Sequence, residues 1–103
     1  MHSLPDVGPL LAAADFEPHV GKDYVVDAVP KPVTVRLEKI IVRPIHADLP
    51  RQPFTLVFTT PWRDLLLEAM YRMQPAVGPP IELFLSPTLT APGERRYYQA
   101  VFS

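Results

Sequence analysis

Cysteine is absent from this sequence of 103 residues. The chain therefore has no disulfide, no zinc–thiolate or iron–sulfur ligand and no thiol nucleophile. A domain of this length does not need such cross-links, because it buries roughly two-thirds of the surface that its unfolded form exposes. We expect a single β domain over residues 10–103, preceded by a flexible N-terminal arm at residues 1–9. The absence of cysteine also suits a reducing compartment, and we expect a cytoplasmic protein.

An excess of charge of one sign and long apolar runs are missing as well. Ten Lys and Arg stand against eleven Asp and Glu, and both signs are spread along the chain. Nucleic-acid-binding proteins collect basic residues on one face, since neutralised phosphates supply most of their affinity. We therefore expect no nucleic-acid partner. No segment approaches the ~20 apolar residues that span a bilayer, and no basic leader precedes the first apolar stretch, so we expect neither membrane insertion nor a signal peptide.

Glycine is scarce, and its four residues are dispersed. No glycine-rich phosphate loop is present, and no serine lies in the Gly-x-Ser-x-Gly turn of many hydrolases. We predict that the protein is not an enzyme and binds no cofactor.

Proline is abundant, with fourteen residues, almost three times the average share of about 5 %. Most of these prolines separate apolar segments instead of lying in polar tracts. Because proline has no N–H to donate, it is excluded from the interior of a sheet and is common between strands. This spacing predicts short strands separated by turns.

Alternating apolar and polar residues predict about six strands. The clearest strand covers residues 33–43, and its apolar phase changes near Lys39. A β-bulge at Glu38 and Lys39 would turn Ile40 and Val42 inward, and we predict one there. The other strands are expected at residues 24–26, 54–59, 69–74, 81–86 and 95–103.

A helix start is predicted after the third strand, at Thr60-Pro61, because Thr is a good N-cap and Pro suits the first helical position. The helix would cover residues 62–67, with Trp62, Leu65 and Leu66 toward the core. For residues 10–16, a helical turn and an extended arm both remain open. The predicted fold is therefore all-β, a small antiparallel meander barrel or sandwich of about six strands with one short helix after the third strand.

Four short motifs mark the chain: Asp15-Phe16 with Val20-Gly21, Phe54 to Phe58 with Pro61 and Leu65, Leu83-Phe84-Leu85-x-Pro87 after Gly78, and Tyr98-x-Ala100-x-Phe102. Together they resemble an uncharacterised family of short bacterial proteins, catalogued as a domain of unknown function, over roughly residues 10–102. The resemblance implies a compact all-β module and an association with phage-tail-like structures. It supplies no catalytic residues.

The best candidate interface lies at the edge of the last predicted loop, where Arg95 and Arg96 precede Tyr97 and Tyr98. Arg and Tyr are typical anchors of protein interfaces. We predict that Arg95, Arg96 and Tyr97 are interface residues and that Tyr98 belongs to the core. The alternative is an ordinary strand, in which aromatic residues are also common.

A second candidate is Trp62-Arg63-Asp64, at the predicted helix start, where free N–H groups can hold an anion. We add Trp62 and Arg63 to the predicted interface. The alternative places Trp62 in the core, with Arg63 and Asp64 solvated or paired.

These features favour a non-enzymatic interaction or assembly module that binds a protein partner or a second copy of itself. A first alternative is a small-ligand-binding barrel with Tyr71, Trp62 and Tyr97 as the walls of its mouth.

A second alternative is a metalloprotein. His46-Ala47-Asp48 offers an imidazole and a carboxylate on one loop, but a catalytic zinc takes three protein ligands. His19 and Glu17 would complete the site only if the two loops meet in the fold.

Overall fold

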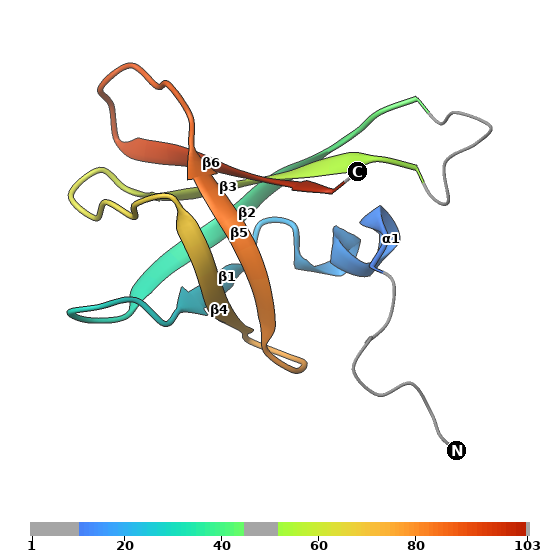
Figure 1. The fold of residues 1–103 in the computed structure, drawn as a ribbon, viewed down its shortest axis with the longest axis horizontal. Helices are drawn as coiled ribbons and strands as arrows, with labels where there is room; N and C mark the ends of the chain where they lie inside the picture. The colour runs from blue at the N-terminus through green and yellow to red at the C-terminus, as the bar shows by residue number, and fades with distance from the viewer. Residues whose placement is uncertain (1–10, 45–51, 103) are drawn as a thin grey trace.

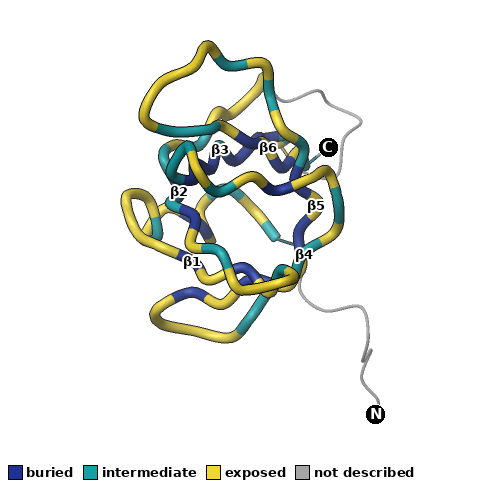
Figure 2. Tube along the Cα trace, turned by 90° about the vertical axis from the view of Figure 1, so that its left-hand side faces the viewer, coloured by how far each residue is buried: buried dark blue, intermediate teal, exposed yellow. Residues whose placement is uncertain are grey.

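A computed structural model describes residues 11–44 and 52–102, and these residues form a closed barrel of six antiparallel strands. Figure 2 shows the strands following one another around a ring. The predictions of an all-β fold and of about six strands are confirmed, and the form adopted is the barrel. The strands are β1 (Asp23–Val26), β2 (Val33–Val42), β3 (Phe54–Pro61), β4 (Ala69–Pro75), β5 (Ile81–Pro87) and β6 (Arg95–Phe102).

The strand order, β1-β2-β3-β6-β5-β4, departs from a simple meander at one connection. Four pairs of consecutive strands are neighbours in the sheet, but β4 pairs with β1 instead of β3. Residues 62–68, yellow in Figure 1, carry the chain from β3 to β4. The place beside β3 is taken by β6, which pairs with it from Phe54↔Phe102 to Pro61↔Arg95.

The predicted bulge lies in β2. Its register with β3 shifts between Leu37 and Lys39, so one extra residue stands on the β2 side. Beyond the shift Ile40 packs against the core, as predicted. Val42 lies opposite the fully buried Phe54 but remains 48 % exposed, because it is the last residue of the strand.

The helical residues precede the first strand, as the short helix α1 (Ala13–Phe16) and the 3-10 helix η1 (Glu17–His19). The predicted helix after the third strand is wrong. Thr60 and Pro61 instead extend β3, where they pair with β6.

The physical reason is visible in the bonds that end β3. Proline fits the end of a strand, where its missing N–H costs little. The Thr60 hydroxyl, rather than capping a helix, donates to the Asp64 carbonyl oxygen at 2.7 Å. The Asp64 N–H donates to the Pro61 carbonyl oxygen at 2.9 Å, which closes one turn before the chain continues without helix to β4.

Apolar side chains fill the barrel interior, and α1 covers it where β3 begins and β6 ends. Phe54 stacks on Phe102 with ring centroids 4.4 Å apart. Phe16 of α1 contacts both rings, at 6.0 Å and 5.7 Å. The apolar residues with no measurable exposure are Val26, Val35, Leu37, Phe54, Leu56, Phe58, Met73 and Leu85.

The stability of this core depends on pH through the buried side chain of Tyr24. Its side chain is 1 % exposed and meets the Phe58 ring edge to face at 5.6 Å. Burial raises the pKa of Tyr24 above its ordinary value of 10.0, because the phenolate would lose its hydration. As the pH rises through the unfolded-state pKa, the unfolded chain releases this proton first, and folding stability falls.

We expect the free energy of unfolding to decrease between about pH 9 and pH 11, and Tyr24→Phe to remove part of that decrease. Denaturant titrations across this range measure both. Tyr97→Phe, which removes a hydroxyl from a 39 % exposed residue, is the matched control. The same alkaline slope in the wild type and in Tyr24→Phe would contradict the assignment.

Candidate functional site

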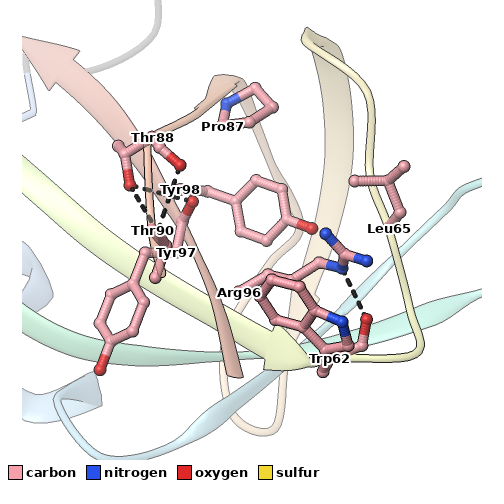
Figure 3. A pocket seen from close by; sticks show the side chains of 8 residues that line it. All are labelled: Trp62, Leu65, Pro87, Thr88, Thr90, Arg96, Tyr97 and Tyr98. Carbon is pink, nitrogen blue, oxygen red and sulfur yellow. Dashed lines mark hydrogen bonds between the residues drawn. The ribbon is translucent and has the colours of Figure 1, made fainter. Parts of the chain in front are cut away.

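Two adjoining hollows lie beside the start of β6. The smaller, which we call the Trp62 hollow, has a volume of about 60 Å³. Figure 3 shows the side chains that line it, among them Trp62, Leu65, Arg96 and Tyr97. The larger, the Lys39 hollow, has a volume of about 350 Å³ and extends over the outer face of β2, β3 and β6. The two share Thr88, Thr90, Tyr97 and Tyr98.

Arg96 and Trp62 form a fixed pair at the Trp62 hollow. The guanidinium carbon of Arg96 lies 4.0 Å from the centroid of the Trp62 ring, a cation–π distance. Arg96 Nε also donates to the Trp62 carbonyl oxygen at 2.6 Å, the dashed line beside the indole in Figure 3. The Trp62 N–H donates to the Glu94 carbonyl oxygen at 2.9 Å. The turn after β3 is therefore fastened to the start of β6.

Tyr98, in the barrel core, binds the rest of the β3–β4 connection. It is 1 % exposed, as the sequence predicted for a core residue. Its hydroxyl accepts the Leu66 N–H at 3.0 Å and lies 3.3 Å from the Thr60 hydroxyl. It also donates to the Asp64 carbonyl oxygen at 3.4 Å. One side chain thus fixes the path of residues 62–68.

Arg95 is engaged within the fold. Its Nε donates to Thr59 Oγ1 at 2.8 Å and its Nη2 to the Thr59 carbonyl oxygen at 3.2 Å. Thr59 Oγ1 in turn donates to Glu38 Oε2 at 2.7 Å, and the same carboxylate oxygen lies 3.9 Å from Arg95 Nε. These bonds occupy the guanidinium, so we leave Arg95 out of the candidate surface.

Arg63 is exposed in the turn after β3. Because residues 62–67 are not helical, the helix start that was expected to hold an anion beside Arg63 does not form. Of the five predicted interface residues, the fold brings Trp62, Arg96 and Tyr97 to one hollow.

A family model described as "Domain of unknown function (DUF6916)" matches residues 11–102. The chain belongs to this family. The resemblance to an uncharacterised family is thereby confirmed, and the match spans all six strands of the barrel. No curated protein and no solved structure matches the chain. In the described part of this DUF6916 member, no helix has the length and apolar character needed to cross a membrane.

In this DUF6916 member the three residues predicted to wall a ligand-binding mouth do not line one hollow, and the ligand-binding barrel stays a prediction. Trp62 and Tyr97 line the Trp62 hollow, whereas Tyr71 lines a different hollow and donates to the Leu67 carbonyl oxygen at 2.7 Å. The barrel interior between them is filled by the core.

The predicted metal ligands are only partly described. His46 and Asp48 lie outside the described residues, and the His19 ring packs against Tyr24 at 5.7 Å. Among residues 11–44 and 52–102, no group of three or more His, Cys, Asp or Glu is placed to hold a metal ion. The metalloprotein alternative therefore stays a prediction.

Sequence reasoning missed the exposure of three leucines, of which Leu65 lines the Trp62 hollow and Leu89 the Lys39 hollow. Leu65, expected on the core side of a helix, is 55 % exposed, and Leu67 is 70 % exposed. Leu89 is fully exposed at the Lys39 hollow. Its place between Thr88 and Thr90, after a proline, was the available signal.

Sequence reasoning also missed Lys39, Arg43 and Thr55, which line the Lys39 hollow. For Lys39 and Arg43 the predicted bulge contained the signal, since Ile40 and Val42 turned inward leave the alternate residues outward. For Thr55 the signal was its place on the polar face of the predicted strand at residues 54–59.

Proposed function

We propose that this DUF6916 member is a non-enzymatic interaction module that associates with a second copy of itself through the surface around Trp62 and Arg96. The observation that carries the proposal is the fixed cation–π pair, 4.0 Å from guanidinium carbon to ring centroid, beside exposed leucines. Trp, Tyr and Arg dominate the binding energy of protein interfaces. Because Arg96 is already held in place, little side-chain entropy is lost when it is buried.

Two exposed leucines follow Trp62 along the β3–β4 connection. Leu65 lines the same hollow as Trp62, and Leu67 follows it on the same connection. Their exposures of 55 % and 70 % are unusual for leucine, and such clusters on a soluble domain mark interaction sites.

The charges of the surface favour a second copy as the partner. Arg63, Glu68 and Glu94 are all exposed and flank the apolar cluster on its two connecting segments. A two-fold interface places each patch against itself, so a patch with both signs can pair its charges across the axis. The formal net charge of −1 adds little repulsion between copies. Repeated copies of a subunit also fit the phage-tail-like setting that the resemblance implies.

Sedimentation equilibrium tests the proposal. We expect a concentration-dependent dimer whose dissociation constant rises at least ~30-fold in Trp62→Ala, as for a residue worth about 2 kcal/mol at an interface. Leu67→Ser should weaken the dimer as well, without changing the circular dichroism spectrum.

Phe84→Ala is the matched control, because Phe84 is 47 % exposed on β5 and lines neither hollow. A strictly monomeric wild type at high concentration would overturn self-association. A dimer that survives both Trp62→Ala and Leu67→Ser would overturn its location.

A further inference from the structure

The Lys39 hollow contains a buried hydroxyl group without a partner. Thr55 is 3 % exposed, and its Oγ1 is the only buried side-chain nitrogen or oxygen of the described residues that forms no hydrogen bond. Thr55 lies in β3, between Ile41 of β2 and Val101 of β6. Buried polar groups in proteins are nearly always satisfied, and an exception calls for a missing partner.

Two cations, Lys39 and Arg43, line this hollow, and no acidic residue in the described part of the chain pairs with them. After the bulge, Lys39, Ile41 and Arg43 alternate with inward residues, so all three point to the outer face. Within residues 11–44 and 52–102 no ion pair involves Lys39 or Arg43, and no Asp or Glu lines the hollow.

Two neighbouring arginines differ from Lys39 and Arg43 because they lie close to a carboxylate. Arg36 and Arg95 both lie within 4 Å of Glu38, at 3.4 Å and 3.9 Å. The outer face of these strands therefore has two arginines that share one carboxylate and, next to them, two cations that pair with no described carboxylate. A pair of cations in a hollow attracts an anion.

The remaining lining suits an organic molecule with several oxygen atoms. Thr88, Tyr97 and Gln99 supply hydroxyl and amide groups, and Val57 supplies apolar surface. The Thr88 hydroxyl donates to the Tyr97 carbonyl oxygen at 3.2 Å, which holds the β5–β6 loop against the strand. A volume of about 350 Å³ lies within the range of small-molecule sites.

We propose that the Lys39 hollow binds a small organic anion, with its phosphate or carboxylate group between Lys39 and Arg43 and its body against Tyr97 and Val57. Less than 1 Å² of Thr55 Oγ1 is exposed. A ligand in the hollow would therefore bond to this oxygen only after rotation about the Cα–Cβ bond of Thr55. This site goes beyond the association surface and does not depend on it.

The test is an amide NMR titration of the full chain with glucose 6-phosphate, glucuronate, glucose and inorganic phosphate, each to tens of millimolar. We expect at least one of the two anionic sugars to shift the resonances of Lys39, Thr55 and Gln99, and the stronger of the two identifies the preferred head group. Glucose should give no shift there, and inorganic phosphate should bind more weakly than the preferred sugar, because it makes no contact with Tyr97 and Val57.

Variants separate a built site from general charge attraction. Arg43→Gln and Lys39→Gln should each weaken binding about tenfold, the value expected for one charge-assisted hydrogen bond. Arg72→Gln is the control, since Arg72 is an exposed cation on β4 that does not line the hollow. Thr55→Val should weaken binding while leaving the free energy of unfolding unchanged or higher.

Three results would overturn the proposal. They are the absence of shifts with both anionic sugars, equal affinity for glucose, and equal losses of affinity in Arg43→Gln and Arg72→Gln.

Discussion

Phe54→Ala is expected to lower the free energy of unfolding by about 3–5 kcal/mol, the range for deleting a buried aromatic ring. Phe54 has no exposed surface and forms the first residue of β3. It stacks on Phe102 at 4.4 Å and meets Phe16 at 6.0 Å, so its removal leaves a cavity between the barrel and α1. Because α1 is only one turn long, this aromatic contact, more than helix propensity, holds it in place.

Chemical denaturation monitored by the fluorescence of the single tryptophan measures the change. Phe84→Ala is the matched control, because the same atoms are removed from a residue that is 47 % exposed. That change should stay within about 0.5 kcal/mol. Equal losses in the two variants would show that the aromatic cluster does not anchor α1.

Tyr98→Phe is expected to cost about 1–3 kcal/mol although it removes a single oxygen atom, because it leaves a buried donor without an acceptor. Leu66 is 3 % exposed, and its N–H donates to the Tyr98 hydroxyl at 3.0 Å. The Thr60 hydroxyl keeps its bond to the Asp64 carbonyl oxygen at 2.7 Å. The loss of stability should therefore affect mainly the later part of the β3–β4 connection.

Denaturant unfolding gives the size of this loss, and hydrogen exchange of the Leu66 amide gives its location. We expect faster exchange of that amide in Tyr98→Phe than in the wild type. Tyr97→Phe, one residue away on the outer face, should change neither quantity. An unchanged exchange rate of the Leu66 amide in Tyr98→Phe would show that the Tyr98 hydroxyl does not hold residues 62–68 in place.

The two substitutions should affect dimerisation differently. Phe54 lies at the end of the barrel covered by α1, so Phe54→Ala should alter stability without altering dimerisation measured well below the unfolding transition. Tyr98→Phe loosens the connection that carries Trp62, Leu65 and Leu67, so it should weaken dimerisation as well.

The candidate site was partly readable in the sequence. The mixture of Arg and aromatic residues at positions 95–98 pointed to the region that the structure joins to Trp62, and its role as an interface stays a prediction. The separation of Arg95 from Arg96 follows from the predicted strand at residues 95–103, but the interface prediction did not use it. Successive residues of a strand point to opposite faces, so Arg95 turns to Thr59 and Glu38 while Arg96 turns to Trp62.

The sequence by itself determined those features that follow from the geometry of a single strand. Side chains alternate between faces every two residues, so the apolar pattern alone located the six strands and the bulge before Ile40. The prolines marked the breaks between them.

Only the tertiary structure decided which strands became neighbours and what residues 60–67 adopt. Thr60-Pro61 has a local preference for starting a helix, but pairing with β6 and the bond network of Tyr98 outweigh it. These partners lie more than thirty residues away along the chain. A pattern within one segment cannot contain such contacts, because they form only when the barrel closes and brings β3 and β6 together.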